Sequence, residues 1–246
     1  MRKLTLLSVM LLGTIAVLAQ KPFKAENDKY GLKDKDGNII AEPVYDKIGG
    51  FSEGLAAVYQ NFQHGYIDTM GKVVIPIKYS DAGLFSEGLA PVQQNWKYGY
   101  INNVGKFIIP NKYDDAERFN EGLAAVKLNG KWGFVDITGK LIVPAKYDAV
   151  EMFWDGFAKI QLNQKKGYVN KSGKEIVTPK YDKIYSFDKE GLAQIFLDKK
   201  QGYVDKTGKE IIPPIYDYIG QFSEGKARVK LNGRSFYIDK SGKEVE

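Results

Sequence analysis

The 246-residue chain contains no cysteine and a single histidine, His64. The lack of cysteine excludes disulfides, zinc–thiolate sites, iron–sulfur clusters and a cysteine nucleophile. One imidazole excludes a multi-histidine metal site. A glycine-rich phosphate loop and a Gly-x-Ser-x-Gly nucleophile motif are also missing. We therefore expect no cofactor and no bound metal, and we predict that the protein is not an enzyme.

Long hydrophobic runs are missing beyond the N-terminus. Arg2 and Lys3 precede the uncharged stretch 4–19, and small or branched residues stand just before Gln20. This layout is typical of a secretory signal peptide, and it is short for a membrane span of about 20 residues. We predict that residues 1–19 are a signal peptide and that the mature protein is exported to the periplasm, the cell surface or the extracellular space. The alternative is that this segment is retained as an anchor.

The charge balance does not point to nucleic acid. The whole chain carries a net charge of +6, and loss of Arg2 and Lys3 with the signal peptide would lower it to +4, since 6 − 2 = 4. A basic patch or stripe is the usual footprint of a nucleic-acid-binding protein. We therefore expect no nucleic-acid partner, and no membrane span once the signal peptide is cleaved.

The rest of the chain is one repeated unit. A glycine recurs every 34 residues, and once after 35, where an extra residue falls in the turn at 187–191. Each unit also holds a tyrosine after a proline and a phenylalanine before an acidic-glycine pair. We predict a single repeat domain over 29–246 after a short lead at 20–28. It has about six full units, with an opening half-unit (29–48) and a closing hairpin (236–246). The spaced glycines, with a phenylalanine in the seventh place, are Gly31, Gly65, Gly99, Gly133, Gly167, Gly202 and Phe236.

Each unit has the pattern of β-strands. Residues 157–162 alternate between apolar and polar side chains with period two, and no stretch after residue 19 has helical periodicity. Pro144 is expected to end a strand because it lacks a ladder donor, and 147–153 could add a fourth short strand. We predict an all-β fold, a solenoid-like open array in which each unit contacts its neighbours. The alternative is a closed propeller-like ring, which would leave no long exposed strand edges.

The fourth unit carries a resemblance. The segment 131–136 (KWGFVD) is followed by Gly139-Lys140, Pro144, Tyr147-Asp148 and the pair Asp155-Gly156. This pattern resembles the WG repeat family of bacterial β-repeat proteins. Only this unit has the literal Trp-Gly, so the chain looks like a Tyr-rich variant. The resemblance implies tandem β-repeats in surface or envelope proteins, without a shared enzymatic reaction.

Positions shared by every unit are expected to build the scaffold. We predict that the recurring aromatic residues form the core between repeats, although a row of rings could instead stack on sugars. An Asp or Asn at the end of the second strand is expected to accept bonds from turn amides. The acidic-glycine pairs are too regular for catalysis, which needs two carboxylates in different environments. A lysine that follows the turn glycine is expected at solvated turns, or alternatively in a column that faces an acidic polymer.

Positions that depart from the pattern are expected to build the site. Phe62 and Trp96 are large rings at adjacent hairpin tips, with Tyr98 close to the same edge and Trp154 at another turn. We predict that Phe62, Trp96 and Tyr98 form a binding patch, to which Trp154 is a weaker candidate. The alternative is that these rings fold back onto neighbouring repeats.

We predict from these patterns an exported, non-catalytic scaffold that binds a protein or cell-envelope partner. The alternative is a carbohydrate- or peptidoglycan-binding module that uses the exposed tip aromatics and the lysine column.

Overall fold

The structure is a computed structural model that describes residues 20–246. The predicted signal peptide, 1–19, lies outside the described residues. The described chain forms 27 strands and no helix. No helix that could cross a membrane is therefore found among the described residues. The strands pair into seven antiparallel sheets, which we number 1 to 7 in chain order. Sheet 1 has three strands and each of the others has four.

Sheets 1 to 3 hold the first eleven strands. Sheet 1 contains β1 (Lys21–Lys24), β2 (Tyr30–Lys33) and β3 (Ile39–Tyr45). Sheet 2 contains β4 (Lys47–Ser52), β5 (Leu55–Gln60), β6 (Gln63–Asp68) and β7 (Val73–Tyr79). Sheet 3 contains β8 (Asp81–Ala82), β9 (Leu89–Gln94), β10 (Lys97–Asn102) and β11 (Phe107–Tyr113).

Sheets 4 to 7 repeat the arrangement of sheet 3. Sheet 4 contains β12 (Asp115–Ala116), β13 (Leu123–Leu128), β14 (Lys131–Asp136) and β15 (Leu141–Tyr147). Sheet 5 contains β16 (Ala149–Val150), β17 (Phe157–Leu162), β18 (Lys165–Asn170) and β19 (Glu175–Tyr181). Sheet 6 contains β20 (Lys183–Ile184), β21 (Leu192–Leu197), β22 (Lys200–Asp205) and β23 (Glu210–Tyr216). Sheet 7 contains β24 (Tyr218–Ile219), β25 (Lys226–Leu231), β26 (Arg234–Asp239) and β27 (Glu244–Val245).

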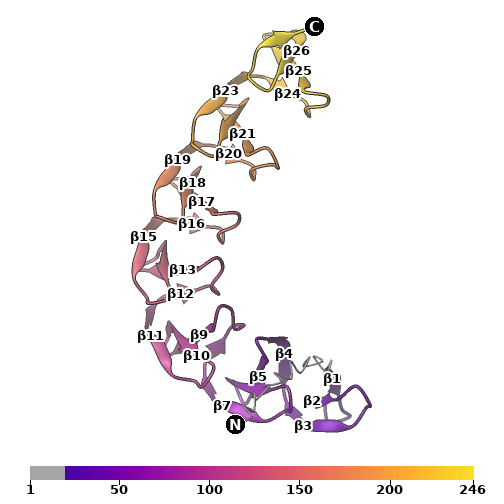
Figure 1. Cartoon of the computed structure of the whole chain (residues 1–246). Coiled ribbons are helices and arrows are strands. Elements are labelled where there is room, and N and C mark those ends of the chain that lie inside the picture. The colour runs from indigo at the N-terminus through magenta and orange to yellow at the C-terminus, as the bar shows by residue number, and fades with distance from the viewer. Residues whose placement is uncertain (1–19) are drawn as a thin grey trace, which may run out of the picture.

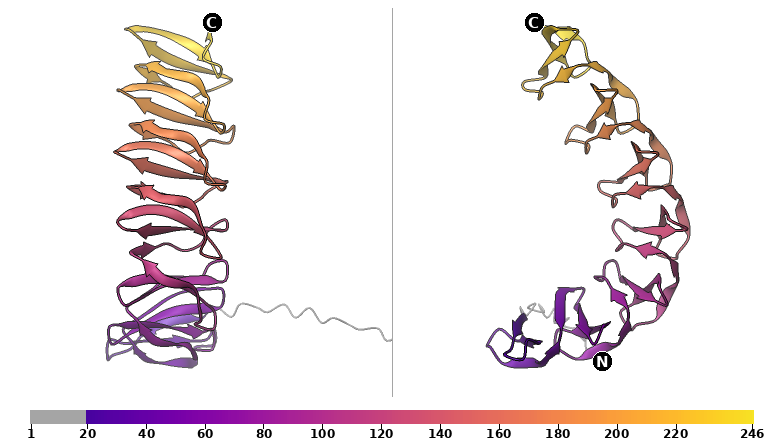
Figure 2. Two further views of the ribbon diagram at one scale, coloured as in Figure 1. Left: turned by 90° about the vertical axis from the view of Figure 1, so that its left-hand side faces the viewer. Right: turned by 180° about the vertical axis from the view of Figure 1, so that it is seen from behind.

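The seven sheets follow one another along an open crescent (Figures 1 and 2). In sheets 1 to 6 the last strand runs along the convex side and leads into the next sheet, and from sheet 3 onward the short two-residue first strand lies toward the concave side (Figure 1). The two ends of the crescent stay apart. The open array is therefore confirmed, and the alternative of a closed ring is wrong.

The strands inside a unit agree with the sequence except at the proline. The fourth short strand exists, since Ala149 and Val150 of β16 pair with Gln161 and Ile160 of β17. The prediction that Pro144 ends a strand is wrong, because β15 continues to Tyr147. A proline is tolerated there because β15 is the edge strand of its sheet and its pairing with β14 contains a register shift. The predicted lead also holds a strand, since β1 pairs with β2.

Two kinds of turn define the two long edges of the array. In sheets 2 to 7 the central hairpin ends in a two-residue tip with positive φ at both residues, such as Asn129 (51°) and Gly130 (77°). This is the geometry of a type I′ turn. We call this side the tip edge. The acidic-glycine pairs and the Asp/Asn turns lie at the other ends of the same strands, which we call the turn edge. Six residues of strand separate the edges by roughly 20 Å.

The Asp/Asn turns are confirmed as predicted. The Asp136 carboxylate accepts bonds from the backbone N–H groups of Thr138 at 2.9 Å and Lys140 at 3.0 Å. The same two bonds form in all seven units. These residues therefore hold turns, and their recurrence has a structural cause.

The recurring aromatic residues form the core between sheets, as predicted. The Tyr100 ring of sheet 3 lies 4.9 Å, centroid to centroid, from the Phe119 ring of sheet 4, and both side chains are fully buried. Edge-to-face and tilted pairs of this kind add to the burial of apolar area. The equivalent pairs at the other junctions are Tyr66–Phe85, Phe134–Phe153, Tyr168–Phe187 and Tyr203–Phe222.

The C-terminal sheet carries a charged outer face. Lys226 and Arg228 of β25 stand where sheet 4 has the buried residues Leu123 and Ala125, and both are exposed. Terminal repeats of an array need a polar outer face for solubility. Sheet 7 is therefore built as a cap.

Candidate functional site

Two bulky aromatic residues occupy tip positions that favour glycine. Phe62 has φ 65° with its side chain 87% exposed, and Trp96 has φ 62° and is 84% exposed. Equivalent tips carry Gly130 and Gly233. The rings do not fold back onto neighbouring repeats, so that alternative is not what the structure shows.

The backbone at these tips costs free energy that the fold does not recover. A non-glycine residue in the left-handed region costs about 1–2 kcal/mol, and an almost fully exposed ring gains little from burial. Strain of this kind, when packing does not explain it, is a reason to look for function. Gln164 and Lys199 hold the same backbone conformation at the tips of sheets 5 and 6, both with φ 65°. What sets Phe62 and Trp96 apart is that a large apolar ring is exposed there.

Tyr98 is placed differently from these two rings. It is half-buried against the core between sheets 3 and 4, and its hydroxyl donates a 2.5 Å hydrogen bond to the Asp81 carboxylate. Burial, and then this bond, raise the pKa of the Tyr98 phenol well above its usual value. The structure thus brings Tyr98 to the same edge as Trp96, but with its polar end engaged by the scaffold.

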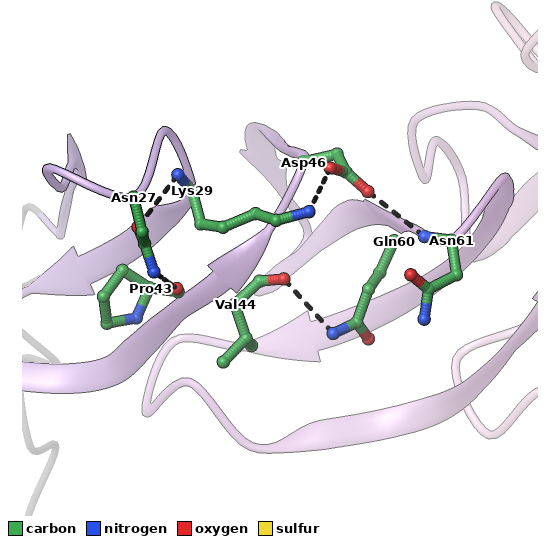
Figure 3. Close-up of polar contacts among 7 residues, drawn as sticks. All are labelled: Asn27, Lys29, Pro43, Val44, Asp46, Gln60 and Asn61. Atoms are coloured by element: carbon green, nitrogen blue, oxygen red, sulfur yellow. Dashed lines mark hydrogen bonds and ion pairs between the residues drawn. The ribbon is translucent and has the colours of Figure 1, made fainter.

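Most junctions between sheets are fastened at the tip edge by an ion pair. Asp46, which follows β3, accepts a 2.5 Å bond from Lys29 Nζ and a 3.1 Å bond from the Asn61 backbone N–H at the tip of sheet 2 (Figure 3). The bond from Lys29 holds the pKa of the Asp46 carboxyl below its ordinary value. The same Lys–Asp pairs, 17 residues apart, are Lys97–Asp114, Lys131–Asp148, Lys165–Asp182 and Lys200–Asp217.

The junction between sheets 2 and 3 lacks this fastening. Gln63 stands in the lysine position and Ser80 in the aspartate position, and the Ser80 hydroxyl bonds to the Gln93 carbonyl instead. Phe62 is at the tip of sheet 2 and Trp96 is at the tip of sheet 3, so the two exposed rings flank this one junction. The sequence contained the signal, because both members of the 17-residue pair change together.

Two buried polar atoms without a partner lie at the same junction. They are His64 Nδ1 and the Tyr79 hydroxyl, on the paired strands β6 and β7. The His64 ring packs against the Tyr59 ring with centroids 4.7 Å apart. Tyr59 and His64 line a depression of about 180 Å³ together with Leu84 of sheet 3. We name Phe62, Gln63, His64, Ser80 and Trp96 together the tip site.

Trp154 does not belong to the tip site. It is 78% exposed, but it lies in the acidic-glycine turn that precedes β17, at the turn edge of sheet 5. The length of β17 separates that turn from the tips. The structure therefore divides the four predicted site residues between two edges of the array.

The lysine column also lies at the turn edge. All six lysines are exposed, and none of them is within 4 Å of a carboxylate in the described chain. They are Lys72, Lys106, Lys140, Lys174, Lys209 and Lys243. Because Phe62 and Trp96 lie at the opposite edge, these lysines and the tip rings do not form one site.

The glutamates that recur in the acidic-glycine pairs of sheets 2 to 4 have structural partners. The Glu87 carboxylate of sheet 3 accepts a 2.9 Å bond from the Gly122 backbone N–H of sheet 4, and Glu53 and Glu121 make the same contact with the sheet that follows each. Within residues 20–246, no group of three His, Asp or Glu side chains gathers closely enough to hold a metal ion. What the tip site offers is apolar surface and hydrogen-bonding groups.

The geometry defines the class of protein: an open array of antiparallel four-stranded β-repeats. Six tandem segments match the WG containing repeat, and the chain belongs to that family. The matched residues are 30–61, 65–98, 98–132, 132–165, 167–200 and 202–234. No curated protein matches the chain in sequence.

Several solved structures match the chain at low sequence identity. A eukaryotic initiation factor is 12% identical, with 94% of this chain and 76% of that chain covered and a TM-score of 0.48. Hsv2 of Kluyveromyces lactis is also 12% identical, with 86% and 87% covered and a TM-score of 0.44. PorZ of the Porphyromonas gingivalis type-IX secretion system is 11% identical, with 89% and 38% covered and a TM-score of 0.35. At these scores none of the three carries an argument about fold or function.

Proposed function

We propose that this protein is an exported, non-catalytic scaffold that binds a protein or cell-envelope partner through the tip site. The observation that carries the proposal is the pair of exposed, left-handed aromatics, Phe62 and Trp96. Two other tips show that the fold accepts glycine at this position. A strained and exposed ring is expected to persist where it contacts something outside the chain.

The surroundings of the two rings support a binding role. Large aromatic anchors supply much of the energy in protein interfaces. The missing ion pair leaves Gln63 and Ser80 at this junction in place of a fixed lysine and carboxylate. His64 adds a polar atom without an internal partner. Among the described junctions, the one between sheets 2 and 3 therefore has polar groups without internal partners and lacks the Lys–Asp ion pair.

The non-catalytic role is supported by the hydrogen bonds and ion pairs that the repeated carboxylates make. Repeated carboxylates bind turn amides or lysines of the adjacent sheet, so they act as fasteners. A catalytic pair requires acids held in contrasting environments, and the described repeats hold them in equivalent ones. Export is proposed from the N-terminal pattern alone.

The test compares residues 20–246 with a Phe62→Gly/Trp96→Gly variant as bait in an envelope extract of the producing cell. Glycine is the matched replacement because Gly130 and Gly233 occupy the same turn position. A variant Lys199→Gly controls for the substitution at a tip outside the tip site. We expect a partner that the wild type and Lys199→Gly capture and that the double variant loses.

Capture of the same partners by all three proteins would overturn the tip site. The second candidate function is a carbohydrate- or peptidoglycan-binding module on the same rings, which the flat and exposed Trp96 indole favours. Competition with soluble envelope glycans separates the two. A protein partner stays bound in their presence, whereas a glycan-mediated capture is lost.

A further inference from the structure

The turn edge changes its construction between sheets 5 and 6. At the three preceding junctions a glutamate reaches the glycine amide of the next acidic-glycine turn, as Glu121 does for Gly156 at 2.9 Å. Sheet 5 has Asp155 in the glutamate position, and its side chain is one methylene shorter. Asp155 accepts a 2.5 Å bond from Lys206 Nζ of sheet 6 instead. The two acidic-glycine turns of sheets 5 and 6 are therefore not bonded to each other as those of the preceding sheets are.

Two further departures fall at the same place. In sheets 2 and 4, the residue before the acidic-glycine pair bonds to a phenylalanine carbonyl of the next sheet: Ser52 to Phe85 at 2.7 Å and Asn120 to Phe153 at 2.6 Å. Sheet 5 has Trp154 there, and its side chain makes no such bond to sheet 6 in the described chain. Sheet 6 adds the inserted residue in its own turn, which is closed by a bond from the Asp188 N–H to the Leu192 carbonyl.

These departures leave a cleft of about 90 Å³ with an aromatic lining. Trp154 stands at its mouth, 78% exposed, and Phe157, Tyr168 and Phe187 line it. Phe187 is only partly buried, whereas the equivalent Phe153 is fully buried. The cleft therefore offers an exposed indole beside two half-buried rings, Phe157 and Phe187, and the buried ring of Tyr168.

The charges around the cleft are paired with each other. Glu151 lies 3.1 Å from Lys159, and Asp155 lies 2.5 Å from Lys206. Each carboxylate thus has a cation from within the chain, which removes the attraction that a cationic or an anionic ligand would need. The four groups remain good donors and acceptors for neutral hydroxyls.

We propose that a neutral carbohydrate binds over the mouth of the cleft between sheets 5 and 6, with a pyranose ring stacked on the exposed Trp154 indole. An aromatic platform beside balanced polar groups fits a ligand that has an apolar face and neutral hydroxyls around its edge. A strongly charged ligand fits less well, because the acids and lysines satisfy one another. This site is independent of the tip site and goes beyond the proposed function.

The experiment titrates residues 20–246 with maltohexaose, cellohexaose and chitohexaose, followed by tryptophan fluorescence and calorimetry. The acidic probe is hexagalacturonate. The key variant is Trp154→Ser, since Ser52, Ser86 and Ser223 hold the same turn position and the fold accepts serine there. The control is Trp96→Gly at the tip site.

We expect at least one neutral hexasaccharide to bind wild type and Trp96→Gly alike. Trp154→Ser should weaken that binding by about tenfold or more, since a stacking platform is lost. Its thermal midpoint should stay close to that of the wild type, which separates a lost site from a lost fold.

The proposal fails if none of the three neutral sugars binds at millimolar concentration, if Trp154→Ser binds as well as the wild type, or if hexagalacturonate binds more tightly than the neutral sugars. Loss of binding in Trp96→Gly but not in Trp154→Ser would also overturn the cleft and assign sugar binding to the tip site. A failure here leaves the envelope capture by Phe62 and Trp96 untouched, so the two proposals are tested separately.

Discussion

The junctions among sheets 2 to 5 and those among sheets 5 to 7 follow one sequence pattern but are built differently. In the first group the junction phenylalanines Phe85, Phe119 and Phe153 are at most 2% exposed. In the second group Phe187 and Phe222 are only partly buried. The first group is joined at the turn edge by carboxylates on backbone amides, and the second by Asp155–Lys206 and Glu190–Lys240 ion pairs.

The comparison shows how a repeat array acquires a site. A backbone amide is a fixed partner, so a glutamate that reaches it draws two turns together. A lysine side chain is long and mobile, so an acid–lysine pair spans a gap without closing it. The shared positions thus hold the crescent, and a few changed residues open it between particular sheets.

The largest expected effect is a contrast between two core rings. Phe119→Ala should lower the free energy of unfolding by about 4 kcal/mol, as for a fully buried phenylalanine. Phe187→Ala should cost about 2 kcal/mol, because that ring is already partly exposed. Urea unfolding followed by far-UV circular dichroism measures both. Equal losses would remove the distinction between the two groups of junctions.

A smaller contrast is expected for the two types of fastener. Glu121→Ala removes bonds to the Asp155 and Gly156 amides and should cost about 1 kcal/mol. Asp155→Ala should change the free energy of unfolding by a few tenths of a kcal/mol, because an exposed ion pair contributes little. Repeating the urea titrations in high salt checks the assignment. Only the small Asp155 effect should shrink when the ion pair is screened.

The tip edge should respond in the opposite direction. Phe62→Gly and Trp96→Gly each relieve left-handed strain of about 1–2 kcal/mol and give up about 0.5–1 kcal/mol to the greater chain entropy of glycine. A net gain of about 0.5 kcal/mol in stability is therefore expected for each. Thermal unfolding tests this result, and a clear loss of stability in either variant would show that the ring serves the fold.

The smallest expected effect concerns pH. Bonds from Lys97 and Lys131 hold the pKa values of Asp114 and Asp148 below the ordinary value of 3.8. A depressed folded-state pKa gives stability that is present above the unfolded value and is lost as the pH falls through the folded value. Stability should therefore decline below about pH 4. Asp148→Asn should flatten this decline in acid titrations of the thermal midpoint. An unchanged slope would show that the Lys131–Asp148 ion pair does not contribute to the pH dependence.

Much of the fold follows from the sequence because its determinants are local and repeated. Period-two alternation, glycine at the Asp turns, and the tyrosine and phenylalanine positions specify strands, turns and the core between repeats. The strand end predicted at Pro144 was wrong because a strand tolerates proline at a sheet edge, and only the assembled sheet shows that β15 is an edge strand. Open rather than closed assembly likewise depends on the small rotation between sheets.

The site was only partly predictable. Phe62, Trp96 and Trp154 are visible as departures from the repeat, but only the structure shows that they lie on opposite edges. Tyr98 is partly buried because it packs against the core between sheets 3 and 4, and its hydroxyl bonds to Asp81 of β8, two strands away in the same sheet. The glutamate contacts at the turn edge join residues 34 or 35 apart through backbone amides, and a sequence pattern alone does not reveal a reach of that kind.

The most direct measurement of the central claim is hydrogen exchange followed by mass spectrometry on residues 20–246. Sheets 2 and 6 are each one sheet away from an end, so fraying affects them equally. The amides of β5 and β6 should exchange more slowly than those of β21 and β22, because local opening depends on how well a junction is closed. Equal protection, or faster exchange in β5 and β6, would contradict a tightly joined first part and an opened second part.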